Sequence, residues 1–432
     1  MENRDKPATV SDMQEEPQPI EPVTTDRRPY AWLAFIGLVV TGIFGAWAFD
    51  RWMVAPTKNV EQNIASTGDR SPMINATTTQ KTVTLTDQAA TTSTPTVAHV
   101  ALPDEVRGIY WTSYTAAGKR GDDLLAYAVS SHLNTIVIDV KLDNGELAFI
   151  PEDPALKPNA PKNPAIKDLD ALLERLRTKG IYRIARLFVF RDQAFGKLHP
   201  NLMLKNGDGS IWRDNTGTAW LDPAAPEVAD YTIAVAREAY NRGFDEVQFD
   251  YVRFPTDGRL SAIRYPVYDG KQTKVAVMKT FFQRVGEALK KEGVPMSFDL
   301  FGMTFWTLND FQIGQRLPDT YPFAVAISPM VYPSHYPNGF QGFANPAQHP
   351  YEIVKQSLDK GIETMKLANP LVDPKEARKK FRPWIQDFNL GATYDRTKIE
   401  AQIKASRDAG ASGWMLWNAA NRYTNATYVI KK

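Results

Sequence analysis

The stretch that decides the fold is Asp245-Glu246-Val247-Gln248-Phe249-Asp250-Tyr251-Val252-Arg253-Phe254-Pro255, which follows a helical pattern over 226–242 and a glycine. Val247 and Phe249 share one face of the predicted strand, whereas Gln248 and Asp250 share the other. In a barrel of parallel strands, the apolar face packs on outer helices and the other face points inward. Asp250 would then lie at the C-terminal end of its strand, where barrel enzymes carry out their chemistry. We interpret it as a catalytic carboxylate; the alternative is a structural ion pair with Arg253.

Eight short apolar segments predict strands, and helical patterns separate most of them. The strands are expected at 108–112, 135–141, 182–190, 246–254, 296–301, 324–330, 383–388 and 413–417. The helices are expected at 122–131, 169–179, 226–242, 274–291, 351–360 and 396–409. This near-regular alternation predicts an α/β fold, a (β/α)8 TIM barrel over 103–432, rather than an open doubly wound sheet.

Polar and aromatic side chains recur at the inward positions near the C-terminal ends of these strands. A barrel that is only packed would hold Val, Ile and Leu there, so the pattern predicts a functional site. The predicted catalytic carboxylates are Asp139, Asp250 and Asp299. The predicted substrate-binding residues are Lys141, Arg186, Tyr110, Tyr251, Arg253, Tyr332, His335, Trp384, Gln386, Trp417 and Asn418.

This combination of residues suits a sugar. Aromatic faces match the apolar C–H faces of sugar rings, and polar groups match the hydroxyl rim. Two carboxylates are the usual minimum for hydrolysis of a glycosidic bond, since one protonates the leaving oxygen and the other attacks or activates water. With 11% aromatic residues, about half of these rings could instead be ordinary core packing.

Three of the side chains have two interpretations each. Arg253 could bind a substrate carboxylate or pair with Asp250, and we favour the pair. Lys141 could lower the pKa of Asp139 or contact a sugar hydroxyl. His335 could be an acid or could cap a turn.

Five segments resemble a family of glycoside hydrolase-like proteins from bacteria and archaea: 137–141, 184–186, 243–255, 328–336 and 382–386. The resemblance runs from about 107 to 421, and the family is distantly similar to α-amylase and α-galactosidase barrels. It implies a glycosidase-like barrel in which Asp250 matches the fourth-strand nucleophile. Asp299 matches the fifth-strand position of the general acid, as Asp where the amylase type has Glu. The sixth strand offers no carboxylate in its motif.

Composition and motif spacing exclude several classes of function. With 51 basic and 49 acidic residues, the net charge is +2, which gives no overall attraction to nucleic acid. The absence of cysteine excludes disulfides and thiolate catalysis. No glycine-rich phosphate loop follows a strand, so we predict no nucleotide. The five histidines show no zinc-ligand spacing, so we predict no metal or other cofactor, although a calcium site built of oxygens stays open.

The first hundred residues predict an anchor rather than a fold. Residues 1–28 form a polar, disordered tail, and 29–54 contain an uncharged run, Tyr30 to Phe49 (30–49), long enough to cross a bilayer. A Thr-, Ser-, Ala- and Pro-rich linker follows over 55–102. We expect a single-pass membrane protein with a cytoplasmic N-terminus and an extracytoplasmic barrel.

Two functions fit these expectations. The first is a membrane-anchored glycoside hydrolase that cleaves an extracytoplasmic polysaccharide or oligosaccharide with paired aspartates. The second is a non-catalytic barrel that binds glycan and organises the cell envelope. Three candidate carboxylates favour the enzyme.

Overall fold

A computed structural model describes residues 97–428, in which eight parallel strands close into a barrel in chain order. The strands are β1 (Val106–Trp111), β2 (Thr135–Lys141), β3 (Tyr182–Phe188), β4 (Glu246–Asp250), β5 (Met296–Phe301), β6 (Ala326–Met330), β7 (Trp384–Gln386) and β8 (Gly413–Trp417). Because β8 pairs with β1, the sheet has no open edge. The predicted (β/α)8 barrel is confirmed.

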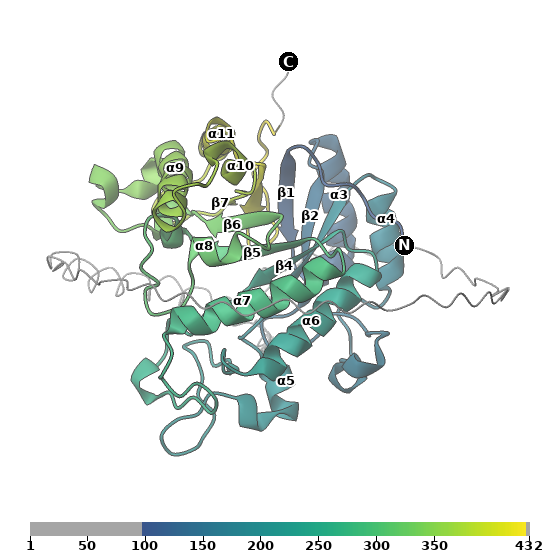
Figure 1. The fold of residues 1–432 in the computed structure, drawn as a ribbon. Coiled ribbons are helices and arrows are strands. Elements are labelled where there is room, and N and C mark those ends of the chain that lie inside the picture. Colours follow the sequence, from purple (N-terminus) through teal and green to yellow (C-terminus); the bar gives the residue numbers. More distant parts are fainter. Residues whose placement is uncertain (1–96, 429–432) are drawn as a thin grey trace, which may run out of the picture.

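Helices surround the strands, and in Figure 1 the long helices α6 and α7 run side by side in front of the sheet. The α-helices are α2 (Ser113–Ala117), α3 (Lys119–Ser130), α4 (Leu169–Arg177), α5 (Gln193–Leu198), α6 (Pro226–Asn241), α7 (Lys274–Lys291), α8 (Leu317–Thr320), α9 (Pro350–Ala368), α10 (Pro374–Arg378) and α11 (Arg396–Asp408). The 3-10 segments are η1 (Pro154–Asn159), η2 (Pro200–Leu202), η3 (Leu260–Ala262), η4 (Gly302–Phe305), η5 (Pro333–His335), η6 (Phe340–Gly342) and η7 (Pro346–Gln348).

The strands that carry the predicted site are shorter than predicted. β4 ends at Asp250 because the next residue, Tyr251, has a left-handed φ of 55°, which a strand cannot continue through. β3 ends at Phe188 instead of 190, although Val189 N still donates to Asp250 O at 2.9 Å. Both strands therefore end level with each other, since Phe188 lies opposite Asp250.

The barrel separates an apolar outer layer from a partly polar interior. Outward residues such as Val247, Phe249 and Phe298 join the helices in one buried cluster. Near the N-terminal ends of the strands, the interior holds a buried ion pair between Glu246 and Arg382. Sequence analysis did not predict this pair, which lies well below the C-terminal ends of the strands.

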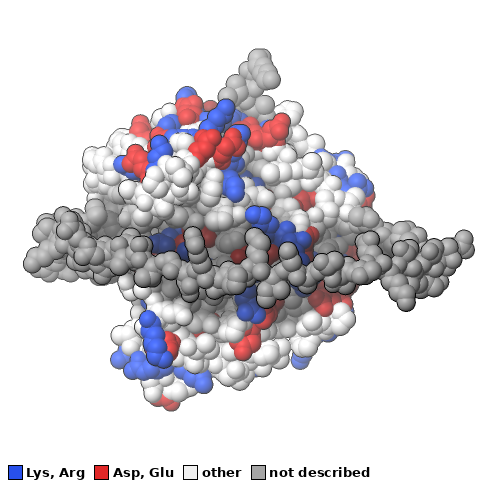
Figure 2. Space-filling model, viewed as in Figure 1, with Lys and Arg blue, Asp and Glu red and all other residues white. Residues whose placement is uncertain are grey.

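On the face shown in Figure 2, acidic and basic side chains are mixed rather than gathered by sign. The mixing is clearest over the helices α9 to α11, where ion pairs join Lys355 to Asp359 and Lys404 to Asp408. This arrangement agrees with the small net charge of the chain.

The predicted membrane span at 30–49 lies outside the described residues, as do the tail and most of the linker. Within 97–428, no helix is both long enough and apolar enough to cross a bilayer. The last linker residues contact the barrel, since Val100 N donates to Asp245 Oδ1 at 2.7 Å.

Candidate active site

Arg186, on β3, is the centre of a carboxylate cluster at the C-terminal end of the barrel. Its Nη1 donates to Asp139 Oδ1 at 2.6 Å, and its Nη2 donates to Asp250 Oδ2. Its Nε lies 3.5 Å from Asp299 Oδ2. The strands β2, β4 and β5 supply the three aspartates, each at an inward position. One buried cation therefore lies within ion-pair distance of three buried acids.

Two donors bind the carboxylate of Asp250. Besides Arg186, the backbone N of Tyr251 donates to its Oδ1 at 2.6 Å. This N–H is aimed at the carboxylate by the left-handed backbone of Tyr251, a conformation that costs energy in a non-glycine residue and is often found at functional sites. Hydrogen bonds from a cation and an amide both favour the charged form of a carboxylate.

Asp299 is the acid that keeps its proton. Burial and the nearby charge of Asp250 raise its pKa well above the ordinary value, although Arg186 opposes them. Trp384 Nε1 donates to Oδ1 at 2.7 Å, while Oδ2 is buried without a hydrogen bond among the described residues. A carboxyl with a raised pKa beside a second carboxyl bound by a cation is an arrangement that separates the pKa values of two acids.

Asp139 orients Arg186. It accepts from Tyr110 Oη at 2.5 Å through the oxygen that Arg186 does not use. Burial raises the pKa of Asp139 and the pKa of Tyr110, so the phenol keeps its proton and stays a donor. Burial opposes the charge of Arg186, but the neighbouring acids raise its pKa above the ordinary value. The guanidinium is thus permanently charged and fixed in place.

Aromatic rings enclose this cluster. Tyr110 and Trp417 stack with ring centroids 4.3 Å apart, and Trp417 meets the edge of Trp384 at 5.5 Å. The guanidinium of Arg186 lies 4.4 Å from the ring centroid of Phe188, which sequence analysis missed. Phe188 shares its parity with Arg186 on β3, so the period-two pattern could have identified it. Tyr332 is buried close enough for Asp299 and Asp250 to raise its pKa further than burial alone.

The prediction that Lys141 points into the barrel is wrong. The pairing of β2 with β3 shifts between Asp139 and Lys141, so that Lys141 lies opposite the outward residue Leu187. A bulge of one residue turns the following side chain to the other face of the sheet. Lys141 Nζ instead pairs with Asp192 at 2.6 Å and lies over the ring of Tyr231 on α6.

Three other predicted residues support the loops around the site. Gln386 Oε1 accepts from Ser334 N at 3.2 Å, and its Nε2 donates to Phe388 O at 2.9 Å. Asn418 Nδ2 donates to Asp387 O at 2.5 Å. His335 is exposed on η5, with Nδ1 3.0 Å from Ser334 Oγ.

Arg253 does not pair with Asp250, which Arg186 holds instead. No acidic side chain of residues 97–428 lies within ion-pair distance of its guanidinium. Its Cζ lies 4.6 Å from the ring centroid of Phe301 and 5.2 Å from those of Trp220 and Tyr251. The long segment between β3 and α6 brings Trp220 here.

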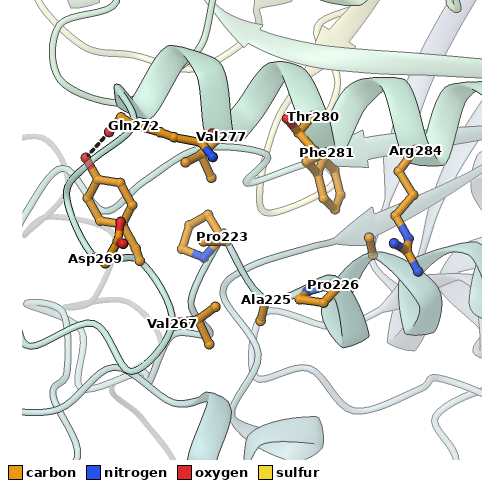
Figure 3. A pocket seen from close by; sticks show the side chains of 13 residues that line it. Pro223, Ala225, Pro226, Val267, Asp269, Gln272, Val277, Thr280, Phe281 and Arg284 are labelled. Atoms are coloured by element: carbon orange, nitrogen blue, oxygen red, sulfur yellow. Dashed lines mark hydrogen bonds between the residues drawn. The ribbon is translucent and has the colours of Figure 1, made fainter.

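Two cavities lie beside the cluster rather than on it. A groove of about 320 Å³ runs along the first half of α7, and Figure 3 shows Pro223, Val267 and Phe281 on its walls. It contains none of the predicted site residues. A cavity of about 260 Å³ is bounded by Phe301, whose ring also touches Arg253, and by Lys274. Within the described part of the chain, no three acidic or histidine side chains are grouped to hold a metal ion.

A closed parallel barrel with acids at the C-terminal ends of its strands is the arrangement that (β/α)8 glycoside hydrolases share. The chain belongs to the family described as "Putative glycosyl hydrolase domain", whose model matches residues 108–423. The resemblance seen in the sequence is therefore confirmed, and with it the assignment to the glycosidases.

The chain is similar to several solved structures, of which the second below supports the fold. A hypothetical protein from Ruminiclostridium thermocellum is 30% identical over 44% of this chain and 96% of that chain, with a TM-score of 0.40. The PgaB (BpsB) glycoside hydrolase domain from Bordetella bronchiseptica is 12% identical over 73% and 94% of the two chains, with a TM-score of 0.50. The α-galactosidase TtGalA from Thermus thermophilus is 16% identical over 72% and 57%, with a TM-score of 0.42. No curated protein sequence matches the chain.

Proposed function

We propose that the chain hydrolyses a glycosidic bond of an extracytoplasmic polysaccharide, with Asp250 and Asp299 as the reacting carboxylates. One observation carries this proposal: beside Arg186, neighbouring strands present Asp250, bound by a cation and a backbone amide, and Asp299, an acid whose pKa is raised. Hydrolysis requires one carboxyl group that donates a proton and a second carboxylate that attacks or activates water, and the two environments suit these two roles.

In the first step, the proton of Asp299 passes to the glycosidic oxygen as the bond from that oxygen to the anomeric carbon breaks. Asp250 attacks the anomeric carbon, or orients a water molecule that does. Positive charge develops on the sugar in this transition state, and the carboxylate of Asp250 stabilises it. If Asp250 attacks, the ionised Asp299 takes a proton from the water that displaces Asp250 from the anomeric carbon and releases its carboxylate. If Asp250 orients the water instead, Asp250 itself takes that proton.

The rings of Tyr110, Trp384 and Trp417 would bind the sugar faces. Their stacked and edge contacts hold them in fixed orientations, which lowers the entropy lost on binding. Trp384 also donates to Asp299, so the same side chain would contact the sugar and position the acid.

The membrane anchor at 30–49 is part of the proposal. The length and lack of charge of this run support it, and the Thr-rich linker would hold the barrel away from the bilayer. Protease added to intact cells should release the barrel by cutting in the linker. A barrel that is cut only after the membrane is broken would contradict this orientation.

Replacing one carboxylate oxygen of Asp250 by an amide nitrogen tests its role in hydrolysis. In the full chain, Asp250→Asn should lower kcat by about a thousandfold, or about 4 kcal/mol, because the negative charge at the anomeric centre is lost. Hydrolysis of a polysaccharide panel gives the rate, and proton NMR of the first product gives the anomer. Glycan affinity should survive, since the rings are unchanged.

Asp170→Asn is the matched control, because it makes the same change on an exposed side chain of α4. It should leave turnover as it is. Unchanged turnover in Asp250→Asn would remove Asp250 from the mechanism. Glycan binding by the wild-type chain without cleavage of any substrate would favour the non-catalytic barrel.

A further inference from the structure

Among the residues that the structure describes, Arg253 is a buried cation without a counter-ion. Only 5% of its surface is exposed, and its single hydrogen bond within residues 97–428 runs from Nη1 to Phe254 O at 3.1 Å. A guanidinium carries five N–H donors and no acceptor. Burying such a group is costly unless an anion or several acceptors compensate it.

The other buried cations around the site are compensated. Lys141 pairs with Asp192, Arg191 pairs with Asp214, and Arg186 pairs with two aspartates. Nearby acids raise the pKa of Arg186 and of Arg191 in spite of burial. For Arg253, burial prevails and lowers the pKa, although Tyr251 and Asp250 oppose it from a distance. Arg253 therefore differs from its neighbours in lacking a close anion.

Aromatic rings surround Arg253, so its N–H groups stay available to bind an anion. The rings of Trp220, Tyr251 and Phe301 all lie within 5.2 Å of its Cζ. Aromatic contacts of this kind stabilise a cation but satisfy no N–H donor. The rings also restrict the movement of the side chain, so it is prepared to bind an anion in one orientation.

Arg253 is also in the right place to meet the substrate. It follows Asp250 by three residues, and its exposed fraction of 5% is close to the 6% of Asp250. Asp250 is also near enough for its charge to act on Arg253 and raise its pKa against the effect of burial. Phe301, whose ring centroid lies 4.6 Å from the Cζ of Arg253, also lines the 260 Å³ cavity, which offers room for a neighbouring sugar unit.

We propose that Arg253 binds an anionic substituent of the substrate, foremost the carboxylate of a uronic acid, and that the substrate is an acidic polysaccharide. A planar carboxylate can accept two parallel hydrogen bonds from a guanidinium. The inference rests on the proposed function for the location of the sugar, but binding can be measured without hydrolysis.

The test compares acidic oligosaccharides with their neutral counterparts. Oligogalacturonate, oligomannuronate and oligoglucuronate would each be titrated into the full chain beside the carboxyl-reduced form, with sulfated oligosaccharides as a further arm. Asp250→Asn would be titrated in parallel so that no ligand is consumed. At least one uronate should bind about tenfold or more tightly than its reduced form.

Arg253→Gln should abolish that preference while leaving the affinity for the reduced form within about twofold, because only the charge-assisted hydrogen bonds are lost. Arg253→Lys keeps the charge but not the two parallel donors, so it should lose part of the preference. Arg237→Gln, on the outside of α6, removes the same charge far from Arg253 and should change nothing. Circular dichroism and thermal melting would show whether each variant folds.

Equal binding of uronates and their reduced forms by the wild-type chain would overturn the inference, whatever the variants do. So would a uronate preference that survives Arg253→Gln, or a preference for sulfate esters alone. An equal loss of affinity for acidic and neutral glycans in Arg253→Gln would also overturn it, because Arg253 would then support the site near Asp250 in general rather than bind an anionic substituent. If the chain cleaves only neutral glycans, the proposed hydrolase function holds and the inference about Arg253 fails. If uronates bind through Arg253 but no glycan is cleaved, the inference holds and the proposed function fails.

Discussion

Two arginine–carboxylate clusters lie inside the barrel, one near each end, and they are built differently. In the lower cluster, Arg382 pairs with Glu246 alone, and both side chains are 1% exposed or less. Ser297 Oγ and Tyr182 Oη also donate to the carboxylate of Glu246, at 2.5 and 3.1 Å. In the upper cluster, Arg186 faces three aspartates.

The difference is one of charge balance. One cation and one anion cancel in the lower cluster, and added hydroxyl donors satisfy the acid, as a structural pair requires. The upper cluster has more acids than cations within contact, so one of the acids, Asp299, keeps its proton. The lower cluster should therefore determine stability, and the upper cluster should determine reactivity.

The largest effect on stability should come from breaking the lower pair. Arg382→Met removes the cation and leaves Glu246 charged and buried, which should cost about 3–5 kcal/mol in the free energy of unfolding. Urea denaturation followed by circular dichroism measures this. Adding Glu246→Leu to Arg382→Met should recover most of the loss, because no buried charge remains. A single variant as stable as the wild type would show that the lower pair is not structural.

Changing an acid to its amide in each cluster sharpens the comparison. Glu246→Gln should cost about 2–3 kcal/mol, because Arg382 loses its counter-ion. Asp299→Asn should be nearly neutral at pH 4, where the native carboxyl is already uncharged, since its Oδ1 can still accept from Trp384.

The pH dependence of Asp299→Asn follows from the raised pKa of Asp299. Folded Asp299 holds its proton while the unfolded chain releases it, so the wild type loses stability as pH rises from the ordinary aspartate value toward the raised pKa. The amide lacks this loss, and the variant should become the more stable protein as pH rises to 7. Denaturation at both pH values would test this, and an unchanged difference would contradict the protonated state of Asp299.

The smallest effect should come from the hydrogen bond to Asp299. In the native protein, the hydrogen bond from Trp384 lowers the pKa of Asp299. Trp384→Phe removes this donor and should cost about 1 kcal/mol of stability. Without the donor the pKa rises further, so the alkaline limb of the rate profile should move to higher pH. Trp414→Phe is the matched control, because the buried Nε1 of Trp414 has no hydrogen bond among the described residues. A shift in both variants would point to packing instead.

The period-two pattern predicted much of this site. It identified the inward aspartates of β2, β4 and β5 and the rings of Trp384 and Trp417, because parity fixes the face of each residue along a regular strand. It failed at Lys141, where a bulge interrupts the register. A bulge depends on the pairing of two strands, and the pattern of one strand does not contain it.

The sequence by itself determined the (β/α)8 barrel, the family and the residues that face its interior, since these follow from periodicity and local motifs. Only the tertiary structure decided which charges meet: Asp250 pairs with Arg186, more than sixty positions away, rather than with nearby Arg253. It also decided that Asp299 is the protonated acid, because burial and the field of Asp250 raise its pKa. Pairing and desolvation depend on distances in space, and spacing along the chain does not fix them.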